Sequence, residues 1–147
     1  MAEQNEIANR LNQILSDYQI YYQNLRGFHW NIQGRDFFEL HAKFEELYTD
    51  AAVKIDELAE RILTIEGRPL HSFDDYQSNA TITSVKNIYD GESAVRNIVN
   101  NLETLVAKEK ELKELASDKK DSGTEDLISA FIEEQEKSLW MYKAWLK

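Results

Sequence analysis

Residues 28–63 read FHWNIQGRDFFELHAKFEELYTDAAVKIDELAERIL, and this stretch decides the fold. After Asp36 its apolar residues recur at steps of three and four, which is the spacing of one face of a helix. That face carries Phe37, Leu40, Phe44, Leu47, Ala51, Ile55, Leu58 and Ile62. Asp36 and Glu39 have the pattern of a capping box, and Pro69 is typical of a position just beyond a helix end. We therefore expect a long helix that continues to about Ile65.

The same spacing predicts three more long helices. They run from about Glu6 to His29, from near Asp90 to a charged turn at 117–123, and from that turn to the C-terminus. Ser122 and Glu125 have the pattern of a second capping box, so we expect Ser122 to cap the last helix.

Residues 68–90, between the second and third long helices, are the least helical part of the chain. Ser72 as N-cap, with Asp75 three residues on, permits one short helix through Tyr76. A connection of this length lets the third long helix run parallel to the second. The sequence therefore predicts a single all-α domain over 1–147, a ferritin-like four-helix bundle with a short extra helix between its second and third helices.

Composition narrows the classes of function. The 147 residues include 5 glycines, 1 proline and no cysteine, so disulfides, thiolate metal sites and thiol catalysis are excluded. There is no glycine-rich phosphate loop, no nucleophile motif, no signal-peptide pattern and no apolar run long enough for a membrane span. We expect a soluble cytoplasmic protein. Its formal charge of −10 suits the attraction of cations, although a solvated acidic surface explains such a charge equally simply.

Two of the three histidines, His29 and His41, lie six residues either side of Arg35, in the turn between the first two helices. In a helical hairpin they would stand at the same height and present two imidazoles to one patch. Such a pair suits a divalent first-row metal ion. The alternative is that each histidine is a structural residue.

Asp56 and Glu60 stand four residues apart and share one face of the second helix. At 100° per residue, they fall with His41 and Glu45 within an arc of about 100° beside the apolar face. Taken alone, two carboxylates at this spacing are also typical of a solvated acidic face. With the histidines, they form a candidate set of oxygen and nitrogen ligands for a metal.

The fifteen residues between His41 and Asp56 span about 22 Å of helix, so one metal ion cannot contact both in one chain. Two subunits paired across a two-fold axis, with these helices antiparallel, would bring the histidines of one to the acids of the other. No Glu-x-x-His occurs, which disfavours the ordinary ferritin centre inside one bundle. We therefore expect the site to exist only in a dimer.

The stretch from Phe28 to Leu63 resembles the signature of the Dps family. It combines His-Trp before the turn, Leu-His after it, and Asp-Glu-x-Ala-Glu-Arg at 56–61. The likeness extends through the region of the short helix and the tail LWMYKAWL. It covers most of the chain.

The resemblance implies a dodecameric shell with a ferroxidase site between two-fold-related subunits. In that pattern His29 and His41 of one subunit, with Asp56 and Glu60 of its partner, bind iron, and Glu45 contacts the site directly or through water. Ferrous iron would be oxidised by hydrogen peroxide in preference to oxygen. The ferric product would be stored as an oxide mineral, which protects the cell against oxidative stress.

The resemblance also bears on residues around the site. Trp30 resembles a tryptophan that members of the family place near the iron, where it would absorb a stray electron. The alternative role for Trp30 is hydrophobic packing. Members of this family admit cations through acidic pores that are lined near the start of the last helix, so Asp121 and Asp126 are candidates for lining such a pore. The alternative is that their negative charges only complement the dipole at the N-terminus of that helix. We expect packing roles for Tyr48, Trp140 and Trp145, and a surface position for His71.

A second function is compaction of DNA, since some members of this family bind DNA through lysine-rich tails. Only Arg10 is basic among the first ten residues, and the chain stops at Lys147, almost at the end of the last expected helix. The charge of −10 also repels a phosphate backbone. We therefore expect no DNA binding. A third function, an inert shell, would make the paired ligands a coincidence.

Overall fold

The computed structural model describes residues 2–147, with side chains from Glu6 onward, and the regular structure within this range is entirely helical. The helices are α1 (Ala2–Asn31), α2 (Phe37–Thr64), α3 (Phe73–Asn79), α4 (Gly91–Asp118) and α5 (Ser122–Leu146). Four are long, and α3 is the short extra helix in the connection between α2 and α4. The predicted all-α bundle with its additional helix is confirmed.

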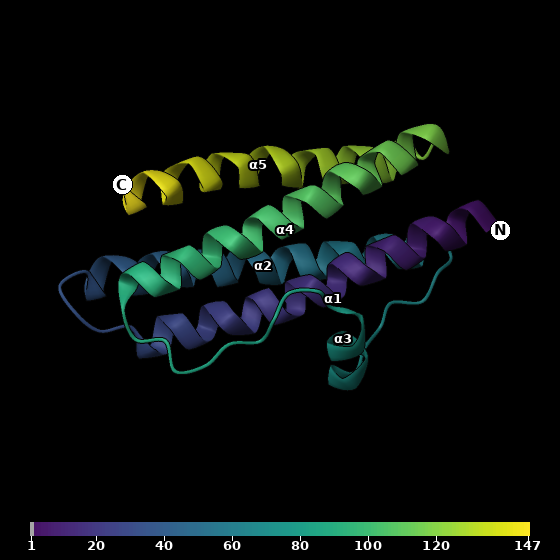
Figure 1. Cartoon of the computed structure of the whole chain (residues 1–147). Helices are drawn as coiled ribbons and strands as arrows, with labels where there is room; N and C mark the ends of the chain where they lie inside the picture. Colours follow the sequence, from purple (N-terminus) through teal and green to yellow (C-terminus); the bar gives the residue numbers. More distant parts are fainter. Residues whose placement is uncertain (1) are drawn as a thin grey trace.

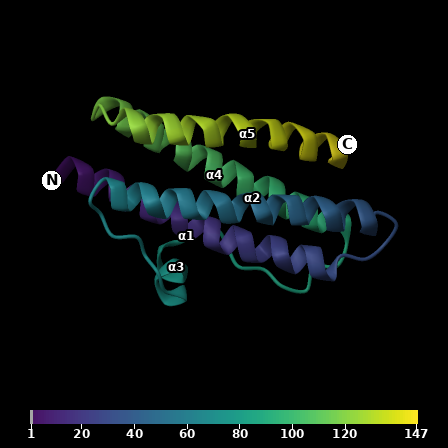
Figure 2. The ribbon, with the colours of Figure 1, turned by 180° about the vertical axis from the view of Figure 1, so that it is seen from behind.

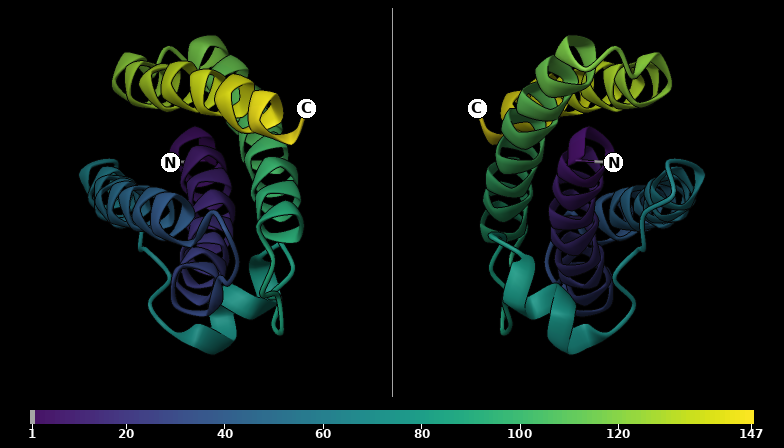
Figure 3. Two further views of the ribbon diagram at one scale, coloured as in Figure 1. Left: turned by 90° about the vertical axis from the view of Figure 1, so that its left-hand side faces the viewer. Right: turned by 90° about the vertical axis from the view of Figure 1, so that its right-hand side faces the viewer.

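The connection between α2 and α4 determines the topology of the bundle. It leaves the end of α2, carries α3, and returns along the bundle, so that α4 starts at the end where α2 starts (Figures 1 and 2). The helix α1 is antiparallel to α2, and α5 is antiparallel to α4. Viewed along the bundle, α1 lies between α2 and α4, while α5 lies against α4 (Figure 3). The long connection therefore makes α2 and α4 parallel, as the sequence predicts.

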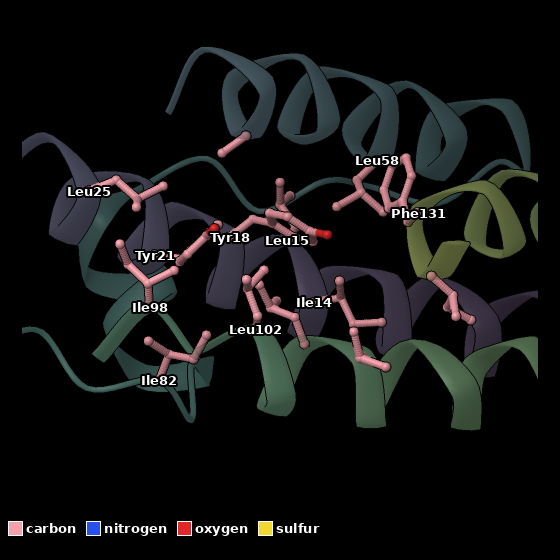
Figure 4. Packing of buried hydrophobic residues seen from close by; sticks show 14 of the residues in the cluster. Ile14, Leu15, Tyr18, Tyr21, Leu25, Leu58, Ile82, Ile98, Leu102 and Phe131 are labelled. Atoms are coloured by element: carbon pink, nitrogen blue, oxygen red, sulfur yellow. The ribbon is translucent and has the colours of Figure 1, made fainter. Parts of the chain in front are cut away.

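The core is built from the apolar faces that the helical spacing predicts. Figure 4 shows how side chains from four helices meet, among them Tyr18, Leu58, Leu102 and Phe131. Tyr18 and Leu58 are completely buried, and Phe131 meets the Tyr18 ring edge-on at 6.1 Å. Burying one large apolar side chain contributes about 1.5–3 kcal/mol. Packing of these faces is therefore what holds the four helices together.

A buried carboxylate fastens the long connection to α1. Asp17 is completely buried, and its Oδ1 accepts hydrogen bonds from the backbone N–H groups of Thr81 (2.6 Å) and Ile82 (2.8 Å). The Nζ of Lys108, on α4, lies 2.9 Å from Oδ2. One carboxylate thus joins α1, α4 and the connection, and it holds an otherwise extended segment along the bundle.

Of the three caps that the sequence predicts, one is confirmed and two are corrected. Ser72 caps α3 and accepts from the Asp75 N–H, although α3 continues beyond the predicted Tyr76. Asp36 precedes α2, but its side chain makes no capping hydrogen bond, because its ψ of 17° departs from the extended backbone that an N-cap residue needs. The expected capping box at that end of α2 is therefore absent.

The start of α5 is capped one residue earlier than the sequence predicts. Asp121 accepts a hydrogen bond from the Thr124 N–H, whereas Ser122 is already the first residue of the helix. Asp121 also pairs with Arg61 of α2 at 2.8 Å, so tertiary structure favours the carboxylate over the serine hydroxyl.

Of the helices described, none combines the length and hydropathy needed to cross a membrane.

Candidate metal centre

His29 and His41 meet face to face across the hairpin of α1 and α2. Their ring centroids are 3.7 Å apart and the ring planes differ by 11°. His29 lies in the last turn of α1 and His41 in the second turn of α2, on either side of the short turn. The predicted equal height of the two histidines is confirmed.

Each histidine ring is also bound to the backbone of the other. The Nδ1 of His29 lies 2.6 Å from the His41 carbonyl oxygen, and the Nδ1 of His41 lies 2.7 Å from the His29 carbonyl oxygen. A carbonyl oxygen only accepts, so both Nδ1 atoms must carry the proton and donate it. In a neutral ring the Nε2 atom then holds a lone pair, which is the tautomer that binds a metal.

Aromatic neighbours restrict the rings further. Phe37 stacks on His41 with centroids 4.9 Å apart, and Tyr48 meets His29 edge-on at 5.3 Å. Tyr48 in turn packs edge-on against Tyr22 at 5.9 Å, which confirms its packing role. Because both rings are held by hydrogen bonds and by packing, their Nε2 atoms need little reorganisation to bind a cation.

Glu45 lies next to the histidine pair on the solvent side. Its Oε1 is 3.6 Å from the His29 Nε2, and its side chain is 59% exposed while that of His29 is 8% exposed. With Nδ1 protonated, the neutral ring presents a lone pair to this carboxylate, so the two atoms repel each other unless a proton or a metal lies between them. Glu45 therefore lies beside His29, but it does not converge with both histidines into an enclosed set of three ligands.

Asp56 and Glu60 do not reach this pair. Both are exposed on α2, and in the part of the chain that the structure describes, no group of three or more His, Asp or Glu side chains converges closely enough to enclose a metal. One subunit thus brings together only the histidine half of the predicted site.

The same face of α2 also carries apolar side chains that are uncovered in the single chain. Phe38 is 83% exposed, Val53 52% and Leu63 58%. At 100° per residue these three positions fall on the same side of the helix as Glu45 and Asp56. We call the surface formed by Phe38, Glu45, Val53, Asp56, Glu60 and Leu63 the α2 outer face. An apolar surface with acids among it is unusual for a purely solvated helix face.

A family model described as a ferritin-like domain matches residues 8–147. The DNA protection during starvation protein of Porphyromonas gingivalis is 41% identical over 139 residues, which cover 95% of this chain and 87% of that protein. The Dps protein of Vibrio cholerae O1 is 50% identical and superimposes with a TM-score of 0.98 over 99% of this chain and 92% of its own. This chain belongs to the Dps family.

A further relative supports the same family assignment. The DNA protection during starvation protein of Brevibacillus brevis is 39% identical over 144 residues, covering 96% of this chain and 95% of that protein. The Vibrio cholerae Dps structure is described as a member of a broad superfamily of ferritin-like diiron-carboxylate proteins. Membership of this family supports a role in iron storage and protection for the chain.

Two of the three tryptophans of this Dps chain have more than half of their surface exposed. Trp30 is 56% exposed, with the Arg26 guanidinium 4.7 Å from its ring centroid. Trp140 is 66% exposed, so the packing role expected for it is wrong for the single chain. Trp145 is partly exposed, and its ring lies against Gly91 at the start of α4. His71 is exposed, as expected.

The two candidates for a cation pore differ in their surroundings. Burial opposes ionisation of Asp121, but hydrogen bonds from Thr124 and the charge of Arg61 outweigh it and lower its pKa. Its carboxylate is therefore ionised but already neutralised by Arg61. Asp126 is exposed on the first turns of α5, and it is the candidate whose charge faces solvent.

Proposed function

We propose that this protein oxidises ferrous iron at sites shared by two subunits and stores the ferric product inside a closed shell, thereby protecting the cell from oxidative damage. The observation that carries the proposal is the His29–His41 pair, in which reciprocal hydrogen bonds through Nδ1 leave both Nε2 atoms for a metal. Membership of the Dps family supports iron as that metal.

Pairing of two α2 outer faces would complete the ligand set. Because His41 and Asp56 are about 22 Å apart along α2, an antiparallel pair of these helices brings His29, His41 and Glu45 of one subunit near Asp56 and Glu60 of the partner subunit. Such pairing would also cover Phe38, Val53 and Leu63, whose exposure in the single chain costs free energy. Exposed apolar and acidic residues on one face thus support a shared site.

The ligand set suits the oxidation of iron. Imidazole nitrogen binds ferrous iron, and carboxylate oxygen is a hard ligand that favours the ferric state. Two ferrous ions supply two electrons, and one hydrogen peroxide with two protons is reduced to two water molecules. Because both electrons arrive together, no hydroxyl radical is released. Hydrolysis of the ferric ions then yields the stored oxide.

The shell that we propose is a cytoplasmic dodecamer, in which each pair of subunits forms two identical sites. Its interior would hold the mineral, and the acidic side chains near the start of α5 would line the entry for cations. Asp126 is the better candidate for this lining, since Asp121 pairs with Arg61.

Anaerobic loading with ferrous iron, followed by hydrogen peroxide, tests this function through the rise of ferric absorbance. We expect rapid formation of soluble ferric product by the native protein, and a loss of at least tenfold in rate for a His29→Ala/His41→Ala variant. The matched control is His71→Ala, which removes an exposed histidine and should retain the native rate. Equal rates in the native protein and the double variant would refute the assigned site.

Compaction of DNA is the alternative function, and the charge distribution opposes it. The net charge is −10 per chain, and Arg10, the one basic residue among the first ten, lies 3.7 Å from Glu111. We expect no shift of a duplex DNA band in a gel at physiological salt. A shift at micromolar protein that disappears as salt is raised would show electrostatic binding and contradict this expectation.

A further inference from the structure

Three polar side chains from three helices meet at the buried centre of the bundle. Tyr18 of α1 and Glu109 of α4 are completely buried, and Gln135 of α5 is 5% exposed. The Tyr18 hydroxyl lies 2.6 Å from Glu109 Oε2, one end of the Gln135 amide contacts the Tyr18 hydroxyl, and the other end lies 2.5 Å from Glu109 Oε1. The three groups therefore form a closed ring of three contacts.

Each contact in this ring joins two electronegative atoms at hydrogen-bond distance, so each needs one proton. Tyr18 has one hydroxyl proton to give, and burial, followed by the charge of Glu109, raises its pKa well above the usual value, so it stays protonated. The Gln135 amide can donate one proton into the ring, since its other end is a carbonyl oxygen. Two of the three protons are thereby supplied.

The source of the third proton does not depend on how the Gln135 amide is turned. If its NH₂ group faces Tyr18, its carbonyl oxygen faces Glu109 Oε1, and only Glu109 can supply the proton between them. If the amide is reversed, its carbonyl accepts from Tyr18, and the remaining contact, between Tyr18 and Glu109 Oε2, again needs a proton from Glu109. Both orientations require a protonated carboxyl group.

We infer that Glu109 is a neutral carboxylic acid in the folded protein, that its proton closes a ring joining α1, α4 and α5, and that the stability of the bundle consequently depends on pH. No step of the proposed iron chemistry uses these residues. The ring holds three helices of the bundle together in a pH-dependent way, and it is independent of the proposed metal centre.

The charged groups around the ring are consistent with a neutral Glu109. From α2, the Lys54 ammonium faces the centre, but it lies 2.5 Å from Asp50 of its own helix and 2.7 Å from Glu134 of α5. Two carboxylates already balance its charge. From α1, Tyr21 is a second buried hydroxyl beside Tyr18. No hydrogen bond or ion pair between Lys54 and Glu109 occurs among the described side chains.

Burial of the carboxyl group opposes its ionisation and is the main cause that raises the pKa of Glu109 from 4.5 to about 8, while the Tyr18 hydrogen bond and the charge of Lys54 act in the opposite direction. Between these two pH values the folded chain retains the Glu109 proton and the unfolded chain does not. The contribution to stability is therefore complete below pH 4.5, falls as pH rises, and is lost above about pH 8.

Unfolding in urea over a range of pH tests this inference with a Glu109→Gln variant. A carboxamide has a donor NH₂ group and an acceptor oxygen where a neutral carboxyl group has a donor O–H and an acceptor oxygen, but it does not titrate. Between pH 4.5 and about pH 8, we expect the unfolding equilibrium constant of the native protein to increase relative to that of the variant by about tenfold per pH unit. Parallel pH profiles for the two proteins would overturn the inference.

Infrared spectroscopy of the native protein gives an answer even if the variant does not fold. Ordinary carboxyl groups are ionised at pH 7, so a carboxylic acid C=O band at that pH would report a buried neutral acid. We expect this band in the native protein, its absence in Glu109→Gln, and its disappearance above about pH 9. A native spectrum at pH 7 that lacks the band would show Glu109 to be ionised and would overturn the inference.

Discussion

The two histidines of the candidate metal centre hold each other in place. Each Nδ1 donates to the backbone carbonyl of the other residue, so position, tautomer and ring orientation are fixed by one reciprocal pair of hydrogen bonds. Phe37 then packs against the His41 ring and Tyr48 against the His29 ring, both from α2. At the scale of single residues, the hairpin by itself fixes the two nitrogen atoms that we propose as ligands, without any contribution from a second subunit.

Asp17 is the residue whose loss should weaken the connection most. Asp17→Ala leaves two backbone N–H groups and Lys108 without their shared acceptor. Leaving buried donors and a charged partner without an acceptor should lower the free energy of unfolding by about 3 kcal/mol. Urea unfolding measures this loss, with Asp74→Ala on the exposed face of α3 as the control. A change below about 0.5 kcal/mol in Asp17→Ala would contradict the role.

Counting residues was sufficient to predict the histidine pair, because height in a hairpin depends only on distance from the turn. The Glu109 ring was missed, since its three members come from three helices and no local spacing connects them. One signal was present: Glu109 stands four residues after Leu105 and three before Leu112, within a run of buried apolar positions. An acid on a buried helix face requires a partner or a proton, and that requirement could have indicated this site.

At the scale of elements, substitutions at the start of α5 test which residue caps this helix. Asp121→Ala removes the hydrogen bond to Thr124 and the ion pair with Arg61, and should cost about 1–2 kcal/mol. Because the pKa of Asp121 is lowered, this contribution is present above its ordinary value of 3.8 and is lost as pH falls through the lowered one. Unfolding experiments at pH 7 measure the cost.

Ser122→Ala is the control for this comparison, since the serine is merely the first residue of the helix. It should change the unfolding free energy by less than about 0.5 kcal/mol. A larger loss for Ser122→Ala than for Asp121→Ala would restore the capping box expected from the sequence.

Helix spacing predicted the long elements and their buried faces well, because a period of 3.6 residues is a property of the chain itself. The ends of the helices were predicted less accurately. The helix α3 extends beyond Tyr76 to Asn79, and the side chain of Asp36 is not used as a cap. The reason is tertiary: Arg61, a residue on another helix, contributes to the choice of Asp121, and no local motif contains it.

At the scale of the whole molecule, two groups of polar residues have different surroundings. The centre of the bundle holds a neutral acid and a lysine whose charge is balanced, so it offers no uncompensated negative charge to a cation. The α2 outer face instead presents acids beside exposed apolar residues. These surroundings favour the α2 outer face, rather than the interior of the bundle, as the place for the proposed metal binding.

Subunit complementation tests the central claim, that each iron site is shared by two chains. One variant carries His29→Ala/His41→Ala and the other Asp56→Ala/Glu60→Ala, and the two are co-expressed so that they assemble together. In a mixed pair, one of the two shared sites retains its histidines from one chain and its acids from the other.

The measurement is the rate of ferric formation after anaerobic ferrous loading and addition of peroxide. If pairing is random, half of the pairs are mixed and each restores one site of two, so the mixed shell should recover about a quarter of the native rate, while each variant alone remains nearly inactive. Co-assembled shells that are no more active than the two parent variants would place all the ligands within a single chain and contradict the account.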